Sequence, residues 1–382
     1  MTWIKKSLFI FGILLCFTML ILAWIGPSYP PVFFLRRSFV LLLLALTLFL
    51  ILLIIKFVAL RVVFTPIIAI LLSLSVAEEI SFKYLEKNRT YFAHNTEFKR
   101  SYLKRVDGFG YRPNPGSYNA KKFISSGEVI YDVVYSIGDD GYRQDSVSKH
   151  FDAYIFGGSF TFGEGVQDDE TISAFLSNDH GIKVKNIGMH GYGLHQALYN
   201  IQNGISAKNA VNILLTSPWH ANRSTCKPSW VKGTFRYQVN DGLAILNGVC
   251  PGGYFLNRVL SKSFFYSLLL KVTETNALKI TDQSIELYLA IINSIYQETL
   301  KNNSSLVIAH IDASEAEMYS TKWTNQSIIN RLNDLSDFVI DVTLAEKIEQ
   351  ISPEFILHRL DNHPSALANR NRANLISDYF KR

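Results

Sequence analysis

The chain has 382 residues, enough for two domains of ordinary size, and its 48% hydrophobic content with a mean hydropathy of +0.12 indicates a membrane segment. The formal net charge is +6, but residues 1–77 contain six Lys or Arg and no acidic residue, and the remaining 32 basic residues equal the 32 acidic ones in number. Because the excess charge lies in the apolar region, this distribution excludes the basic patch of a nucleic-acid-binding surface, and no nucleic-acid partner is predicted.

Three apolar stretches in that region, residues 7–25, 38–55 and 57–77, each approach the roughly 20 residues that span a bilayer as a helix. No small-residue cleavage site follows the first, so it differs from a cleaved signal peptide. Arg61 and Pro66 make the third stretch the least regular. With three spans, four of the six basic residues lie on the cytoplasmic side, as the positive-inside tendency requires. We therefore expect residues 1–77 to anchor the chain in a bacterial inner membrane, with the remainder periplasmic.

Cysteine placement agrees with an oxidising compartment. Cys16 lies in the first predicted span, whereas Cys226 and Cys250 flank a polar, aromatic insertion and are the only cysteines in the rest of the chain. A disulfide between them would contribute about 3 kcal/mol by closing a loop of that size. The alternative is a pair of free thiols in a cytoplasmic protein, which would also require an even number of spans.

Residues 78–151 are charged and mixed in character. The stretch 107–116 is rich in turn residues, and residues 129–137 form a β-branched and aromatic strand that ends at Gly138. We expect a small β-containing lead-in segment that packs beside the following domain.

From residue 152 to 382, short apolar strands alternate with amphipathic helices. The predicted strands are residues 153–156, 183–186, 211–216, 306–311 and 338–342, and the predicted helices are residues 171–177, 194–205, 283–301 and 365–379. Such alternation predicts an α/β domain with a mostly parallel sheet covered by helices on both faces.

A serine follows the first of these strands. Residues 153–156 lead directly into Gly157, Gly158 and Ser159, so the hydroxyl is delivered at the carboxyl end of a strand, where open α/β sheets bind their ligands. One alternative is a glycine-rich loop that only turns the chain. A phosphate-binding loop is disfavoured, because the segment has no Gly-Lys-Ser/Thr ending and no G-x-G-x-x-G spacing.

Two later stretches favour a nucleophilic serine. Asn186-Ile-Gly188-Met-His-Gly191-Tyr-Gly193 follows a short strand, and Asp361-Asn-His363-Pro-Ser365 precedes a helix near the end of the chain. Together with Gly-Gly-Ser159-Phe-Thr-Phe-Gly, these motifs resemble blocks I, II and V of the SGNH (GDSL-like) hydrolases. The resemblance covers about residues 152–380 and implies a three-layer α/β/α fold with a five-stranded sheet and serine ester chemistry.

The resemblance assigns Ser159 as the nucleophile, His363 as the base that activates it, and Asp361 as the group that orients the base. In many family members the acid lies three residues before the histidine, a position held here by Leu360. The alternative for Asp361 is an N-cap of the following helix. The aspartate that often precedes the nucleophile is replaced by Gly158, so lipase-like members are poor guides to this chain.

An oxyanion hole also follows from the resemblance. Its expected donors are the backbone N–H groups of Ser159 and Gly191 and a third side chain, for which the sequence offers His220 or Asn222. Either side chain has the alternative of capping a loop.

Metal binding is not predicted. His190 and His195 bracket Gly191, but no cysteine or acid lies near them at ligand spacing, so both are expected to be loop or substrate-contact residues. The serine mechanism needs no cofactor, and none is predicted.

Three functions fit these features. The first is an ester hydrolase that removes small acyl groups, such as acetyl, from an acylated small molecule or an envelope glycan. The second is an O-acetyltransferase that passes the acyl group to a sugar hydroxyl and depends on an acyl-transporting membrane partner. The third is a non-catalytic binding or assembly protein, which an intact set of Ser159, Asp361 and His363 disfavours.

Overall fold

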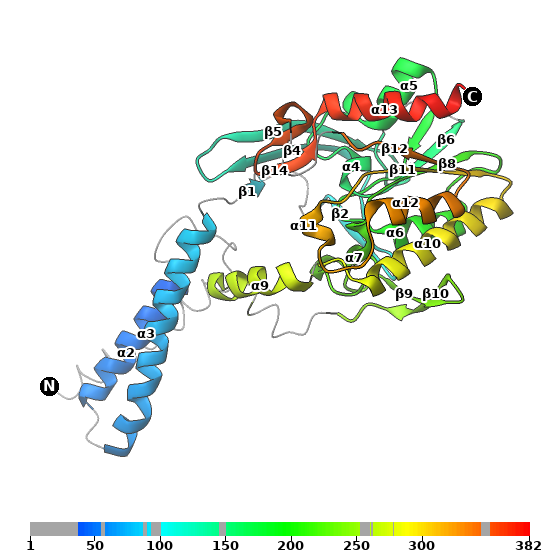
Figure 1. Ribbon diagram of the computed structural model, residues 1–382. Coiled ribbons are helices and arrows are strands. Elements are labelled where there is room, and N and C mark those ends of the chain that lie inside the picture. The colour runs from blue at the N-terminus through cyan, green and yellow to red at the C-terminus, as the bar shows by residue number, and fades with distance from the viewer. Residues whose placement is uncertain are drawn as a thin grey trace. The chain divides into compact units, whose positions relative to one another are not determined.

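The computed structural model describes residues 37–54, 58–86, 90–92, 101–144, 150–252, 260, 263–277, 279–344 and 352–382 (Figure 1). The chain divides into two compact units. Unit 1 comprises Met1–Arg89 with Gly253–Thr275, and unit 2 comprises Thr90–Gly252 with Asn276–Arg382.

Unit 1 contains two apolar helices in the region predicted to be membrane-embedded, α2 (Arg37–Ile54) and α3 (Val58–Glu86). The Ser75 hydroxyl of α3 donates to the Ser38 carbonyl of α2 at 2.6 Å, so the two helices pack together. Among the described residues, one helical stretch, Arg61–Glu86, has the length and composition needed to cross a membrane, while the apolar part of α2 is shorter. The predicted span over residues 7–25 lies outside the described residues.

Helix α3 continues beyond the predicted end of the third span at residue 77, because no Gly or Pro follows Ala77 before Glu86. Its buried Glu78 accepts a hydrogen bond at 2.8 Å from the backbone N–H of Phe264. Phe264 begins a further helix of this unit, α9 (Phe264–Ala277), which the sequence analysis did not predict.

Unit 2 is built on a five-stranded sheet in which every strand pair is parallel. The order across the sheet is β12 (Phe338–Asp341), β11 (Ser305–His310), β8 (Val211–Thr216), β6 (Ala153–Phe156) and β7 (Val184–Asn186). All five strands were predicted, within one residue at each end. Most of their residues are buried, as expected of a parallel sheet whose two faces are both covered by helices.

Helices cover both faces of this sheet (Figure 1). One face packs on α5 (Ile172–His180) and α13 (Ala366–Phe380), through a core that includes Ile155, Leu176 and Ile376. The opposite face packs on α6 (Leu194–Gln202), α10 (Asp282–Lys301) and α12 (Asn325–Asp334), and its core includes Leu214 and Ile291. The predicted α/β class and three-layer arrangement are confirmed.

Helix α12 was missed because its sequence, NQSIINRLND, is mostly polar and buries only Ile328 and Leu332. Short elements complete this part of the chain: α4 (Ser159–Phe162), the 3-10 turn Asp168–Glu170, α11 (Glu315–Met318), the 3-10 turn Pro353–Phe355, and the hairpin of β13 (Ile356–His358) and β14 (Asp361–Pro364).

Strand order creates a crevice at one point of the sheet. Strand β6 lies between β7 and β8, and the chain leaves β6 through α5 on one face and returns from β7 through α6 on the other. Such a switch point opens a crevice outside the carboxyl ends of the strands, where α/β proteins bind ligands. The loops after β6, β7 and β8 all reach this edge.

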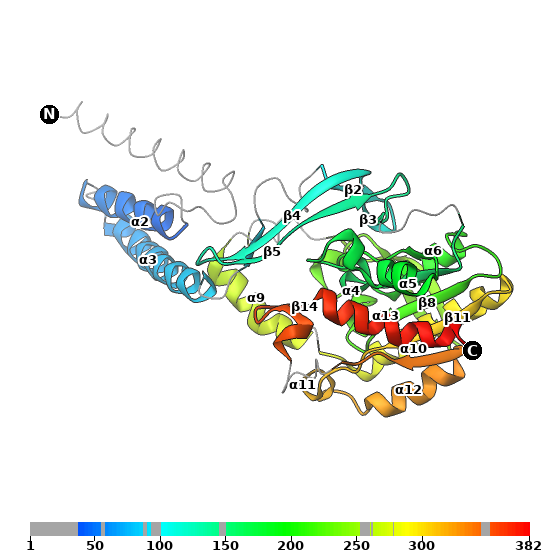
Figure 2. The same cartoon turned by 90° about the horizontal axis from the view of Figure 1, so that it is seen from above.

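The lead-in segment forms two small antiparallel sheets, seen beside the α/β layers in Figure 2. One sheet has the order β1 (Thr90–Phe92), β4 (Gly116–Ile124) and β5 (Val129–Ile137), and the other pairs β2 (Leu103–Val106) with β3 (Gly110–Pro113). Strand β5 was predicted with these bounds. An aromatic core joins the segment to the α/β domain, since Phe109 and Tyr135 share a buried cluster with Phe162 and Tyr192.

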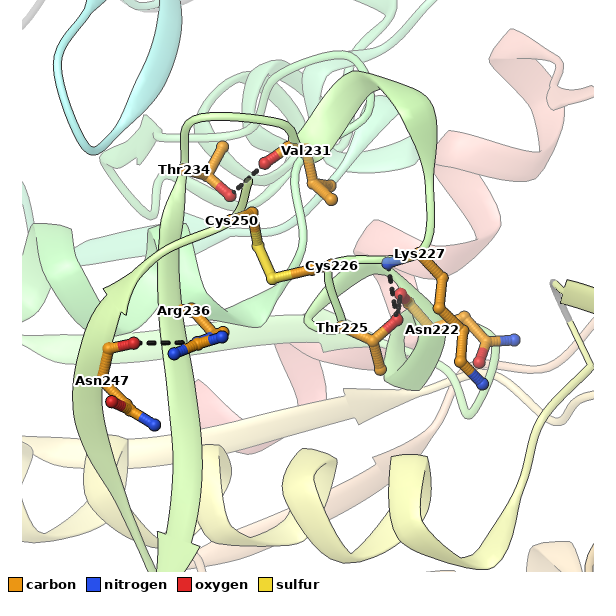
Figure 3. The surroundings of a disulfide bond; sticks show 9 residues. All are labelled: Asn222, Thr225, Cys226, Lys227, Val231, Thr234, Arg236, Asn247 and Cys250. Carbon is orange, nitrogen blue, oxygen red and sulfur yellow. Dashed lines mark hydrogen bonds between the residues drawn. A yellow bond between two sulfur atoms is a disulfide. The ribbon is translucent and has the colours of Figure 1, made fainter. Parts of the chain in front are cut away.

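The insertion after β8 begins with α7 (His220–Arg223) and continues through the 3-10 turn Ser229–Val231 to the hairpin of β9 (Phe235–Asn240) and β10 (Leu243–Val249). Cys226 and Cys250 form a disulfide that closes this insertion (Figure 3). The hydroxyl of Thr225, next to the bridge, donates to the Asn222 carbonyl at 2.7 Å and so links the bridge to α7.

Candidate active site

The predicted nucleophile occupies a tightly packed turn at the carboxyl end of β6. A Cβ atom on Gly157 would lie 2.1 Å from Thr161 Oγ1 and 2.8 Å from the Leu215 carbonyl oxygen, so only glycine fits there. Helix α4 starts at Ser159, and the Ser159 hydroxyl faces the imidazole of His363. Ser159 is buried, with 5% of its surface exposed.

The three residues assigned to catalysis lie in contact. Ser159 Oγ is 2.9 Å from His363 Nε2, and His363 Nδ1 is 2.5 Å from Asp361 Oδ1. Asp361 Oδ1 also accepts the backbone N–H of His363 at 3.1 Å. This hydrogen bonding places the Nδ1 proton toward Asp361 and leaves Nε2 as the acceptor of the serine proton, which is the arrangement that a serine nucleophile requires.

The shorter spacing between acid and histidine is accommodated by strand β14. Asp361 and His363 lie two residues apart in this strand, so their side chains project from the same side. The N-cap alternative for Asp361 is wrong, because the cap of α13 is Ser365, whose hydroxyl accepts the Ala368 N–H at 3.3 Å.

A lysine from the lead-in segment reaches the same carboxylate. Lys122 of β4 places its ammonium 2.6 Å from Asp361 Oδ2 and 3.8 Å from Glu164 Oε1. The side chains of Asp361 and Glu164 are only 2% and 8% exposed, so this cation offsets part of the charge of two buried carboxylates. Sequence reasoning missed Lys122, because no local pattern distinguishes it from its neighbour Lys121.

Glu164 is the second residue that sequence reasoning missed. It lies five residues after Ser159, and its Oε2 is 2.7 Å from His190 Nδ1 and 3.3 Å from His363 Nε2. Its place in the same glycine-rich motif as Ser159 was the available signal. His190 was expected to be a loop or substrate-contact residue. Its ring is instead buried and contacts Glu164.

Charge coupling shifts the pKa of each group. Burial alone would raise the pKa of Asp361, but the hydrogen bond and charge of His363 and the charge of Lys122 hold it well below its usual range. Burial also opposes ionisation of Glu164, yet His363, His190 and Lys122 lower its pKa to about 2. For His363, burial lowers the pKa, and the charges of Glu164 and Asp361 more than reverse this and raise it above its usual value.

Gly191, an expected oxyanion donor, lies in the loop after β7 with φ +69°. Two aromatic side chains hold this loop through hydrogen bonds. Tyr111 of β3 donates its hydroxyl to the His190 carbonyl at 2.5 Å, and the Trp230 indole N–H donates to the Gly191 carbonyl at 3.1 Å. A Cβ on Gly191 would lie 2.7 Å from the Tyr111 hydroxyl oxygen, so this position accommodates only glycine.

Both candidates for the third donor lie in α7. His220 Nδ1 is 3.1 Å from Thr216 Oγ1 and accepts the Ser217 N–H at 3.4 Å, so its proton is on Nε2. Burial and the neighbouring charge of Arg223 hold the pKa of His220 well below its usual value, which keeps the ring neutral. Asn222, next to the disulfide in Figure 3, lines the same cavity as Ser159.

The remaining predicted residue, His195, is buried in α6, and burial lowers its pKa to about 3. Within the described ranges, the groups close enough to share a metal ion are Glu164, Asp361 and His363, whose ligand atoms lie within 4.8 Å of one another. The Lys122 ammonium places one positive charge beside these two carboxylates.

A cavity of about 560 Å³ opens over Ser159 and His363. Its aromatic lining comes from Phe160, Trp219 and Trp230, and its charged lining includes Lys122, Arg223, Asp312, Glu317 and Asp361. Trp230 is 44% exposed. The cavity is large enough for an acyl group together with part of a sugar or another alcohol.

No family model and no curated protein matches this chain. Among solved structures, it is similar to a protein from Desulfitobacterium hafniense described as lipolytic and of the G-D-S-L family, with 12% identity and a TM-score of 0.32 over 59% of this chain and 98% of that chain. It is also similar to a carbohydrate esterase family 2 enzyme with a carbohydrate-binding domain from Corynascus thermopiles (Myceliophthora fergusii), with 12% identity and a TM-score of 0.29 over 64% and 69% of the two chains. At such TM-scores these likenesses decide neither fold nor function.

Proposed function

We propose that this chain is a membrane-anchored, periplasmic serine ester hydrolase of the SGNH type, acting on small acyl esters such as O-acetyl groups. One observation carries the proposal: Ser159 Oγ, His363 Nε2, His363 Nδ1 and Asp361 Oδ1 form a continuous chain of 2.9 Å and 2.5 Å contacts at the carboxyl edge of a parallel sheet. The apolar helices α2 and α3 and the Cys226–Cys250 bridge support the anchor and the compartment.

The reaction follows from this geometry. Ser159 Oγ attacks the acyl carbon while its proton passes to His363 Nε2, and the carbonyl π electrons move to oxygen. Collapse of this intermediate breaks the bond to the alcohol oxygen, which leaves with the proton from His363. Water then repeats the sequence on the acyl-serine and releases the free acid and Ser159.

The second candidate is an O-acetyltransferase, in which a sugar hydroxyl replaces that water. Trp230 supports it, because this residue lines the cavity and is 44% exposed, and a flat aromatic ring offers an apolar surface on which a sugar ring can stack. Such a transferase would receive its acyl group from an acyl-transporting membrane partner. A non-catalytic role is the weaker alternative, since it leaves the contacts of Ser159 and His363 unexplained.

The test uses the full-length chain in detergent with 4-nitrophenyl acetate. Ser159→Ala is expected to abolish hydrolysis, His363→Ala to be nearly as damaging, and Asp361→Asn somewhat less, because members of such a unit are not additive. Ser126→Ala, at an exposed turn, is the matched control and should retain wild-type activity.

Adding an envelope-type oligosaccharide separates the two enzymes. Acetylated sugar that appears faster than free acetate indicates a transferase, whereas loss of acetyl from an acetylated sugar indicates an esterase. If wild type and Ser159→Ala are indistinguishable on every acyl donor, both enzyme proposals are wrong.

A further inference from the structure

We propose that Arg223 is a catalytic residue that supplies a positively charged donor to the oxyanion hole. This inference rests on the proposed acyl-enzyme and adds a group that the sequence motifs do not assign. It starts from Gly158, the residue before the nucleophile. A Cβ atom on Gly158 would lie 2.5 Å from Arg223 Nη1 and 3.3 Å from His220 Nε2, so the guanidinium occupies the space that a side chain at position 158 would fill.

Arg223 has no ion-pair partner among the described residues, and the nearby charge of Glu164 acts on it without direct contact. Its hydrogen bond is from Nη1 to the Tyr192 carbonyl at 3.2 Å, and no carboxylate of the described chain forms an ion pair with it. Lys122, by contrast, is paired with two carboxylates. The half-buried guanidinium keeps its proton. Because it has no ion-pair partner among the described residues, its charge can stabilise a negative charge that forms beside it.

Its position is between the two loops that supply the backbone donors. Gly158 precedes Ser159 directly, and Tyr192, whose carbonyl anchors the guanidinium, follows Gly191 directly. Arg223 also lines the cavity that contains Ser159. A charge at this place stabilises the oxygen that becomes negative when Ser159 Oγ bonds to the acyl carbon, and it is held there before the reaction begins.

His220 and Arg223 have different parts in this arrangement. They lie one turn apart in α7, so both side chains project toward Gly158. The neutral His220 ring offers its Nε2 proton as a hydrogen-bond donor, whereas the guanidinium offers a full charge. No proton leaves Arg223 during the reaction, because the proton of Ser159 goes to His363 and then to the departing alcohol.

The experiment measures kcat and KM of the full-length chain on 4-nitrophenyl acetate, an ester without a charged group on its acyl side. Arg223→Gln is expected to lower kcat on the order of 10²-fold with little change in KM, as for loss of one oxyanion donor. Arg223→Lys should recover part of the loss. Gly158→Asp places a carboxylate beside the guanidinium and should lower kcat further than Gly158→Asn, which has the same size and no charge.

A second measurement is the rate at which a fluorophosphonate labels Ser159, since the phosphoryl oxygen of this probe takes the place of the oxyanion. Labelling should slow in Arg223→Gln, with circular dichroism confirming the fold. If Arg223→Gln retains wild-type kcat and labelling, the inference is overturned. If it only raises KM for esters that carry an acid group, the inference is also overturned, and the guanidinium binds substrate instead. If the wild-type chain neither hydrolyses the ester nor is labelled at Ser159, the proposed function is wrong, and this inference fails with it.

Discussion

Glu164 Oε2 lies 3.3 Å from His363 Nε2, the same nitrogen that faces Ser159 Oγ at 2.9 Å. While His363 is neutral, its Nε2 lone pair faces both the serine hydroxyl and this carboxylate. Once Nε2 holds the proton of Ser159, Glu164 becomes a favourable neighbour, because opposite charges now meet in a buried place. Glu164 therefore stabilises the imidazolium that forms during acyl transfer.

The first prediction concerns the pH dependence of activity. His363 must be neutral to accept the serine proton, so activity falls as the pH drops through its pKa, which Glu164 raises. Glu164→Gln removes this charge and should move the acid limb of kcat/KM to lower pH. The pH profile of ester hydrolysis measures the shift. Asp132→Asn, at an exposed ion pair, is the control and should leave the limb in place.

The second prediction compares two adjacent lysines of β4. Lys122→Met leaves the carboxylates of Asp361 and Glu164 buried without their cation, which should lower the free energy of unfolding by about 3–5 kcal/mol. Lys121→Met removes an exposed pair with Asp132 and should cost about 0–1 kcal/mol. Urea unfolding measures both.

Lys122→Met should also move the acid limb of kcat/KM to higher pH, because the charge of Lys122 lowers the pKa of His363. A limb that moves in the same direction in Lys122→Met and Glu164→Gln would contradict this description of the site.

The third prediction concerns the loop after β7. Gly191→Ala introduces a Cβ at φ +69° and 2.7 Å from the Tyr111 hydroxyl, which should displace the Gly191 N–H and lower kcat on the order of 10²-fold. Gly204→Ala has nearly the same φ, +72°, with nothing within 4 Å. It should cost about 1–2 kcal/mol of backbone strain and leave kcat unchanged. Equal kcat values in the two variants would remove Gly191 from the oxyanion hole.

The fourth prediction separates the two candidates for the third donor. His220→Ala should lower kcat far more than it raises KM, because its Nε2 proton faces Gly158 and acts mainly in the transition state. Asn222→Ala should have the smaller effect on kcat. The reverse order would assign the donor to Asn222.

The fifth prediction concerns topology. A phosphatase that is active only in the periplasm, fused after Arg382, should be active, because the basic residues of the N-terminal region favour an external C-terminus. An inactive fusion, together with an active cytoplasmic reporter at the same position, would contradict the proposed compartment.

The sequence was most informative where chemistry is local. Ser159 and the pair Asp361 and His363 each lie in a short motif, and most strands of the parallel sheet follow from continuous apolar runs. Lys122 and Arg223 carried no such signal. Their importance depends on the register of β4 and on the space beside Gly158, and neither property is present in a local run of residues.

Because Lys122 lies in β4, the part of the chain that the active site requires begins well before Ser159. Ser159, Asp361 and His363 all lie after residue 152, so a fragment cut at that point would keep every motif by which the site is recognised. That fragment would lack the Lys122 ammonium that offsets part of the charge of Asp361 and Glu164, as well as Tyr111, which holds the loop of Gly191. The smallest fragment that keeps this active site intact therefore begins near Thr90. A fragment chosen from the motifs alone would contain the catalytic residues without the neighbouring positive charge of Lys122.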